Sequence, residues 1–185
     1  DAGHEAAAFV ADVSKDDDVQ ALIAAIAERF GRIDILINNV AISDNRHILE
    51  ITEQEWDDTI RVTLKSPFLM TKHAAQRMVA QGSGGKVVNI GSTSGYRGRG
   101  SAVAYSAAKG GVANLTKALA YQLAPHGIRV NSVSPNRTGS PVGRQEVDPN
   151  RTFKNLVERP GVPDDTAHVV VFLCTEDAEM IRGQI

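Results

Sequence analysis

The 185-residue sequence lacks the features that mark disulfide-bonded, membrane-spanning and nucleic-acid-binding proteins. Its single cysteine, Cys174, has no partner for an internal disulfide, and its place in the apolar run 169–174 favours a small buried side chain over a reactive thiol. No apolar run approaches the ~20 residues of a membrane span. A net charge of −2 favours neither a nucleic acid nor an anionic membrane as a partner. With 42% apolar and 23% charged residues, the composition agrees with a soluble enzyme.

Motifs for metal binding and for hydrolysis are also missing. The five histidines are too scattered for a local zinc motif, and the aspartates at 16–18 lack the spaced oxygens and the glycine of a calcium loop. The segment 91–95 resembles a Gly-x-Ser-x-Gly elbow, but its central residue is Thr93. Ala80 stands where a P-loop ending at Gly85-Lys86 needs its first glycine. The sequence therefore predicts no metal site and does not support a serine hydrolase.

Strand-like and helix-like segments alternate along the chain, as is typical of an α/β fold. A first helix is predicted to begin at Ser14 as N-cap and to end at Gly31. The capping-box pattern at 52–55 opens a further helix, which Pro67 is expected to interrupt. The apolar, β-branched segment 85–90 predicts a short buried strand.

Tyr105 and Lys109 form a Tyr-x-x-x-Lys pair, and Ser92 lies just past the strand predicted at 85–90. On a helix this spacing places the phenol and the ammonium on one face. A phenol titrates near pH ~10 in water, and a nearby cation favours its phenolate form. By itself the pair is as typical of an ordinary helix with a snorkelling lysine. With Ser92 at the carboxyl end of a strand, the three groups suffice for proton transfer to or from a carbon-bound oxygen.

A series of motifs then occurs in the order and at the spacing of one enzyme family. They are Asp12-Val13, the segment 35–41 with its paired asparagines, the Ser92, Tyr105 and Lys109 trio, and the segments 131–136, 163–167 and 181–184. Over nearly its whole length the chain resembles the classical short-chain dehydrogenases/reductases, and 3-oxoacyl-[acyl-carrier-protein] reductases among them. The resemblance implies a doubly wound, Rossmann-like parallel sheet flanked by helices, with 1–185 as one NAD(P)-binding and catalytic domain. Within it, the polar segment 138–159 is either a flap over the substrate or a plain surface loop.

The resemblance also implies an activity, the interconversion of a secondary alcohol and a ketone with NAD or NADP. Tyr105 is then the general acid in reduction and the base in oxidation, Lys109 favours the phenolate and binds the nicotinamide ribose, and Ser92 orients the substrate oxygen. Thr63 replaces a family asparagine that helps to hold a water of the proton relay. Cofactor contacts are expected from Asp12, Val13, Asn38, Val40, Ala41, Tyr105, Lys109, Pro135, Asn136, Thr138 and Ser140.

The front of the chain departs from the family pattern. The family opens with a strand, a glycine-rich turn and a helix, and this first βαβ unit has no counterpart in the sequence. Residues 6–12 instead resemble the third strand. In the order 3-2-1-4-5-6 that strand and the one at 33–37 would lie three spacings apart, roughly ~14 Å. We therefore expect the working protein to have a preceding segment; a truncated protein with an incomplete sheet is the alternative.

Further departures surround the expected nicotinamide. Thr63, Val40-Ala41 and Asn136 replace Asn, Ala-Gly and Gly of the family. They favour an alternative from another class, a cofactor-binding or interaction protein with weak or no turnover. The resemblance further implies a small-molecule alcohol or ketone as substrate, a homodimer or homotetramer, and a cytoplasmic location. It does not choose between NAD and NADP, or among thioester, sugar, steroid and small-alcohol substrates.

Overall fold

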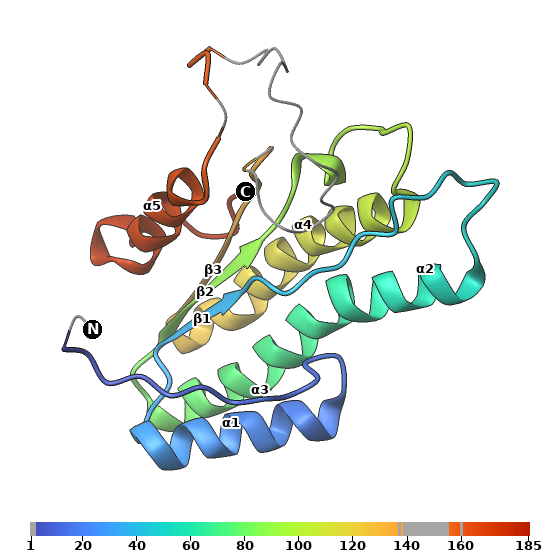
Figure 1. The fold of residues 1–185 in the computed structure, drawn as a ribbon. Coiled ribbons are helices and arrows are strands. Elements are labelled where there is room, and N and C mark those ends of the chain that lie inside the picture. The colour runs from blue at the N-terminus through green and yellow to red at the C-terminus, as the bar shows by residue number, and fades with distance from the viewer. Residues whose placement is uncertain (1–2, 137, 139–155, 160) are drawn as a thin grey trace.

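A parallel sheet forms the centre of the computed structural model, which describes residues 3–136, 138, 156–159 and 161–185 (Figure 1). Strands β1 (Ile35–Asn38), β2 (Gly85–Ile90) and β3 (Ile128–Val133) lie in the order β1-β2-β3. Ile37 pairs with Val88, which pairs with Asn131. All three strands are parallel, so their carboxyl ends meet at one edge of the sheet.

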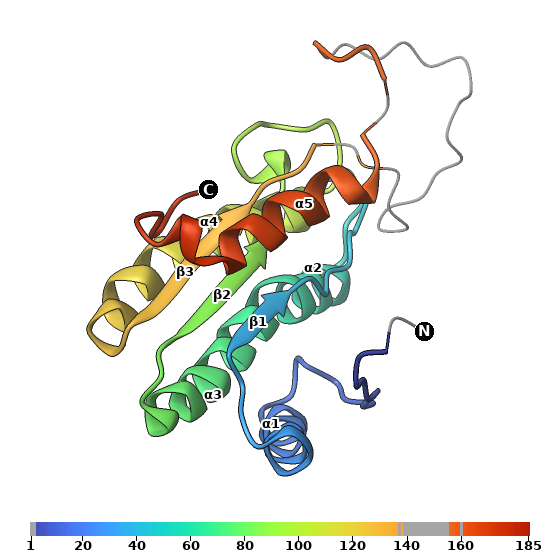
Figure 2. The same ribbon diagram turned by 90° about the vertical axis from the view of Figure 1, so that its left-hand side faces the viewer.

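Helices cover both faces of this sheet, which confirms the expected doubly wound α/β arrangement (Figure 2). The α-helices are α1 (Asp16–Phe30), α2 (Glu53–Ile60), α3 (Ser66–Gln81), α4 (Val103–Leu123) and α5 (Pro163–Cys174). The short helices are η1 (Arg61–Lys65), η2 (Thr93–Gly95), η3 (Ala124–His126) and η4 (Glu176–Ala178). Helices α3 and α4 lie on one face and α5 lies on the other (Figure 2). None of the helices in the described residues is long and apolar enough to cross a membrane.

The strand expected at 6–12 is not formed. Residues 4–12 run as an irregular segment beside α1 (Figure 1), where Arg29 pairs with Glu5, and residues 4–10 are exposed. A strand exists only where a neighbour satisfies its backbone groups. In the described part of the chain the sheet ends at β1, where Ile35 and Ile37 are 46% and 40% exposed. At the other edge the backbone of Gly183 and Gln184 is hydrogen-bonded to β3.

The ends of the helices follow the sequence signals with one exception. Gly31 closes α1 in the left-handed conformation, and Thr52 forms the predicted capping box of α2. Ser14, however, is not the N-cap of α1; Lys15 takes that position without a side-chain cap. The Ser14 hydroxyl is engaged elsewhere, because it donates to Asp12 Oδ1 at 2.5 Å and accepts from Arg61.

Helices α2 and α3 are joined without a gap through the π-helical turn η1. The interruption expected at Pro67 is therefore a change of helix type and not a break in the helix. Pro67 lies in the first turn of α3 and has no N–H to donate to the carbonyl of Thr63, four residues earlier. A π-helical turn accommodates this local mismatch by widening the helix. As a result Thr63 lies in the widened turn, where it is 1% exposed.

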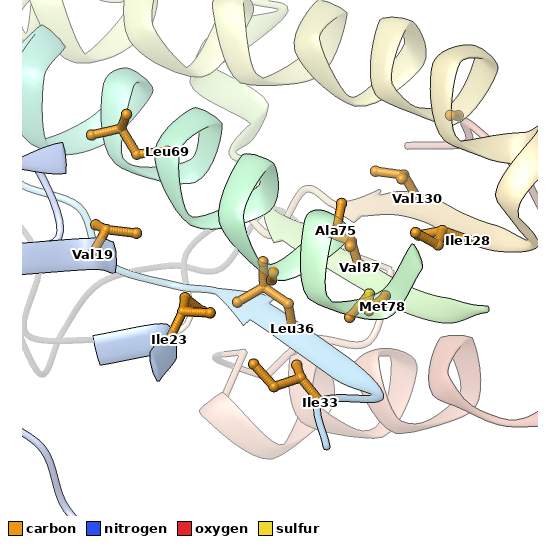
Figure 3. Close-up of a cluster of buried hydrophobic side chains, with 12 residues drawn as sticks. Val19, Ile23, Ile33, Leu36, Leu69, Ala75, Met78, Val87, Ile128 and Val130 are labelled. Atoms are coloured by element: carbon orange, nitrogen blue, oxygen red, sulfur yellow. The ribbon is translucent and has the colours of Figure 1, made fainter. Parts of the chain in front are cut away.

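The main hydrophobic core packs α1 and α3 against one face of the sheet (Figure 3). Val19 and Ile23 of α1 meet Leu36 of β1, while Met78 of α3 lies over the sheet beside Val87. Met78 is fully buried, and full burial of such a side chain stabilises the fold by roughly 1.5–3 kcal/mol. This core therefore holds α3 in place on one face of the sheet.

Replacing Met78 with alanine is therefore expected to lower the free energy of unfolding by about 2–5 kcal/mol, because a cavity is left in the core. The matched control is Val79→Ala on the next residue, whose side chain is 41% exposed. That change should stay within ~0.5 kcal/mol of the parent protein. Urea denaturation of the three proteins measures both values. Equal costs for the two substitutions would show that Met78 does not anchor α3.

Candidate active site

The loops that follow β2 and β3 are joined at the carboxyl edge of the sheet. The Gly91 N–H donates to the Val133 carbonyl at 2.8 Å, and the Thr93 N–H donates to the Pro135 carbonyl at 3.2 Å. The Thr93 hydroxyl lies 3.3 Å from Asn136 Oδ1. The structure therefore brings Pro135 and Asn136, which the family resemblance leads us to expect at the cofactor, next to the turn that begins at Ser92.

Ser92 is held in an extended conformation at the start of η2, immediately past β2. Its hydroxyl accepts the Ser94 N–H at 3.1 Å, and the side chain is largely buried. A hydroxyl has one proton and two lone pairs. Accepting one hydrogen bond leaves the proton of Ser92 available to a substrate oxygen, which suits the role expected from the sequence.

Tyr105 and Lys109 lie on one face of α4, as their spacing predicts. The Lys109 ammonium is 5.7 Å from the centre of the Tyr105 ring and donates to the Ile90 carbonyl at 2.5 Å. Lys109 is only 3% exposed, and this burial lowers its pKa from 10.5 to about 8. The ammonium is therefore mostly charged at neutral pH, and it lies between β2 and the phenol.

A close contact between two glycines brings the Ser92 turn onto α4. A Cβ built on Gly95 would lie 2.8 Å from the Gly110 nitrogen and from the Lys109 carbonyl atoms. Real Cβ atoms essentially never come this close to backbone, so only glycine fits at Gly95 without moving the turn. The distance between Ser92 and the Lys109 region is therefore set by backbone packing.

Thr63 is hydrogen-bonded to the backbone of the loop that follows β1. Its hydroxyl donates to the Ile42 carbonyl at 2.9 Å and accepts the Ile42 N–H at 3.1 Å. The hydroxyl proton is thus engaged by backbone, and only one lone pair remains for a water. In the structure Thr63 fastens the loop that follows β1 to the π-helical turn.

Asp12, which is expected to contact the cofactor, is linked to the helices that begin with α2. The pKa of Asp12 is lowered, first by hydrogen bonds from Ser14 and then by the charges of Lys15 and Arg61. Arg61 also donates to Asp58 at 2.9 Å. Arg61 therefore links the segment around Asp12 to the end of α2, a contact that no local sequence signal predicts.

A small hollow of about 60 Å³ lies at the carboxyl end of β1. Its walls include Val13, Asn38 and Val40, three of the residues expected from the family resemblance to contact the cofactor. The Asn38 side chain is directed inward, because its amide donates to Asn89 at 2.8 Å and to Thr71 at 3.1 Å. Its amide therefore cross-links β1, β2 and α3.

Some expected site residues are not joined to this group by the structure. No hydrogen bond ties Ala41 or Thr138 to the trio among the described residues. Ser140 and most of the segment 138–159 lie outside the described residues. A larger hollow of about 450 Å³ is lined by Tyr96, Lys117, Ser134 and 183–185, and it contains no residue expected to be catalytic or cofactor-binding. The described residues contain no cluster suited to a metal ion.

One residue of the site was not found from the sequence. Asp44, in the loop after β1, accepts hydrogen bonds from the backbone N–H groups of Ala104 and Tyr105. The two partners are 60 and 61 residues away along the chain. The sequence signals for a helix start lie within a few residues of it, so they do not predict a cap from a residue this far away.

Known proteins resemble the chain along almost its whole length. The family model described as enoyl-(acyl carrier protein) reductase matches residues 1–185. An uncharacterized oxidoreductase of Schizosaccharomyces pombe is 38% identical over 184 residues, which are 96% of this chain and 71% of that protein. The 2-dehydro-3-deoxy-D-gluconate 5-dehydrogenase of Escherichia coli is 33% identical over 186 residues, 98% of this chain and 74% of the relative. Acetoin dehydrogenase from Salmonella typhimurium has a crystal structure that matches with a TM-score of 0.84 at 31% identity, covering 95% and 71% of the two chains.

The burial of Lys109 gives a prediction about its titration. In the protein without cofactor, the ammonium should lose its proton around pH 8, because desolvation favours the neutral amine. Exposed lysines titrate near pH ~10.4. NMR of isotope-labelled lysine side chains, with a Lys109→Met variant to assign the signal, measures the midpoint. A midpoint near that of the exposed lysines would contradict the buried position of the ammonium.

Proposed function

The chain belongs to the classical short-chain dehydrogenase/reductase family of oxidoreductases, and from this we propose that it interconverts a secondary alcohol and a ketone with NAD or NADP. The observation that carries the proposal is the buried Lys109 ammonium, which lies beside the Tyr105 ring and donates to the Ile90 carbonyl at the end of the strand that leads to Ser92. A phenol beside a buried cation and near a serine hydroxyl supplies the groups that proton transfer to or from a carbon-bound oxygen requires.

The proton steps follow from these three side chains. In reduction, the Tyr105 hydroxyl gives its proton to the ketone oxygen, and the Lys109 ammonium stabilises the phenolate that remains. In oxidation, the phenolate takes the proton of the alcohol. Ser92 donates a hydrogen bond to the same substrate oxygen and so holds it within reach of the phenol. When bound, NAD(P)H would supply the hydride in reduction and NAD(P)⁺ would accept it in oxidation.

The residues that would hold the cofactor lie along the carboxyl edge of the sheet. The small hollow at the end of β1 has Val13, Asn38 and Val40 in its walls. Pro135 and Asn136 are hydrogen-bonded to the turn after Ser92. Lys109 makes no ion pair with a carboxylate in the described residues, so its remaining N–H groups suit ribose hydroxyls. The donor set therefore fits a nicotinamide dinucleotide.

Further parts of the proposal come from the family and from the relatives' names. They are one NAD(P)-binding and catalytic domain over 1–185, a small-molecule alcohol or ketone as substrate, a homodimer or homotetramer, and a cytoplasmic location. The relatives include dehydrogenases of 2-dehydro-3-deoxy-D-gluconate and of acetoin. Panels of ketones for activity tests should therefore contain a keto sugar acid, acetoin or its diketone, and a 3-oxoacyl thioester.

The alternative is a protein that keeps the fold but has weak or no turnover. One contact favours it: Ile42 engages the Thr63 hydroxyl as both donor and acceptor, at the position where the family has an asparagine. Such a protein would bind NAD(P) without using the trio. The two functions differ in turnover, and the substitutions below separate them.

Replacing Tyr105 with phenylalanine is expected to lower kcat by about 10²–10⁴-fold, because general acid-base catalysis contributes a factor of that size. The dissociation constant of NAD(P)H should stay within about 3-fold of the parent value, since only the hydroxyl is lost and a 3-fold change is below ~1 kcal/mol. NAD(P)H absorbance follows turnover, and its fluorescence follows binding. The control is Tyr121→Phe, on the same helix but 86% exposed, which should leave both unchanged. Substantial turnover by Tyr105→Phe would remove the assigned role.

Replacing Thr63 with asparagine tests the alternative. A reductase weakened by the missing amide should turn over faster in this variant, because the amide reaches farther than the hydroxyl and can both donate and accept. A protein without catalytic function should stay inactive. Steady-state kcat of the parent and the variant, measured at saturating NAD(P)H, decides between them. Circular dichroism of the variant checks that the loop held by Ile42 has not unfolded.

A further inference from the structure

Tyr105 lies in the first turn of α4, and this turn needs hydrogen-bond partners from outside the helix. The first four N–H groups of an α-helix have no acceptor within it. The N-cap of α4 is Ala102, which is completely buried, has a φ of 65°, and has no side chain that can cap. The position of the catalytic phenol therefore depends on whichever group satisfies these N–H groups.

The loop after β1 supplies the acceptors. Asp44 Oδ1 accepts the Tyr105 N–H at 3.0 Å, and Asp44 Oδ2 accepts the Ala104 N–H at 3.3 Å. The Arg46 carbonyl accepts the Ala102 N–H at 2.8 Å. Hydrogen bonds from N–H groups to a carboxylate are stronger than those to neutral acceptors, and an anion at a helix N-terminus is favoured by the helix dipole.

This loop is itself fixed on both sides of Asp44. Before it, the Ile42 backbone is held by the Thr63 hydroxyl. After it, the Arg46 guanidinium donates to Glu55 at 3.1 Å, and Glu55 belongs to the capping box of α2. Asp44 therefore lies on a segment anchored to α2 and η1. It holds α4 at a defined place relative to them.

We propose that Asp44 is a positioning residue for Tyr105, one that fixes the first turn of α4 and with it the phenol relative to Lys109 and Ser92. The inference rests on the proposed function, because the position of the phenol matters only if it transfers a proton. Asp44 acts through the backbone of Tyr105 and contacts neither substrate nor cofactor. A displacement of about 1 Å at a reacting group costs up to ~10²-fold in rate.

Three variants of the purified protein test this role. Asp44→Ala removes both acceptors, Asp44→Asn keeps an amide oxygen and is a good helix cap, and Ser43→Ala is the control. Ser43 is the neighbouring residue, and its hydroxyl contacts Asn45 at 3.1 Å rather than α4. Ketone reduction gives kcat and the KM for NAD(P)H. Amide hydrogen exchange of the first turn of α4 reports the cap without depending on activity.

The expected result is a coupled loss in Asp44→Ala alone. Its kcat should fall about 10- to 100-fold with the KM for NAD(P)H unchanged, since the misplaced group is the proton donor. Its Ala104 and Tyr105 amides should exchange about 2- to 30-fold faster, the range of a lost cap. Asp44→Asn should restore both values to within about 3-fold, because asparagine and aspartate are roughly equal as helix caps.

Several results would overturn the inference. If amide exchange in Asp44→Ala were faster but kcat unchanged, Asp44 would cap the helix without affecting catalysis. If amide exchange were unchanged, Asp44 would not cap the helix. An Asp44→Asn variant as slow as Asp44→Ala would also overturn it. If the parent protein reduced no ketone, both the proposed function and this inference would be wrong. If the parent protein were active and Asp44→Ala had the same kcat, only the inference would be wrong. Should Asp44→Ala not fold, Asp44→Glu carries the test, because its longer side chain displaces the same carboxylate; an unchanged kcat would then contradict the role.

Discussion

The site depends on the burial of the charged Lys109 ammonium. Its 3% exposure and the absence of a facing carboxylate in the described residues make the charged form costly, which is why its pKa falls to about 8. That shift corresponds to roughly 3 kcal/mol against the charge, a large part of the ~5–15 kcal/mol by which a typical domain is stable. The Ile90 carbonyl offsets part of this cost. The rest of the fold has to offset the remainder, so a charge is kept beside the Tyr105 ring at a cost in stability.

Because the charge of Lys109 is buried, the helix that carries it has to be placed accurately. Gly95 allows the Ser92 turn to rest on the backbone of α4 near Lys109. Asp44 accepts hydrogen bonds from the backbone N–H groups at the start of the same helix. Both constraints act on backbone, where displacements are shared by every side chain of the turn. The relative positions of phenol, ammonium and hydroxyl thus follow from how α4 is held at its first two turns.

How much of this arrangement was predictable from the sequence depends on the range of the forces involved. The capping box at Thr52, the strand β2 and the shared face of Tyr105 and Lys109 arise between near neighbours, and the sequence predicts each of them. The strand expected at 6–12 did not form, because a strand requires a partner that local sequence cannot supply. The cap from Asp44 was missed for a related reason, since its partners lie about sixty residues away. Local signals therefore identify the proposed catalytic groups but not the contacts that hold them.

Thr63 shows how one departure from the family pattern acts on two parts of the site. Its hydroxyl holds Ile42, and Ile42 begins the loop that carries Asp44 to the start of α4. A side chain at this position therefore affects the proton path through any water it binds, and the place of Tyr105 through the loop it anchors. The threonine hydroxyl anchors the loop through one donated and one accepted hydrogen bond, which leaves it a single lone pair for a water. The residue is buried in the π-helical turn before Pro67, so neither effect can be changed without the other.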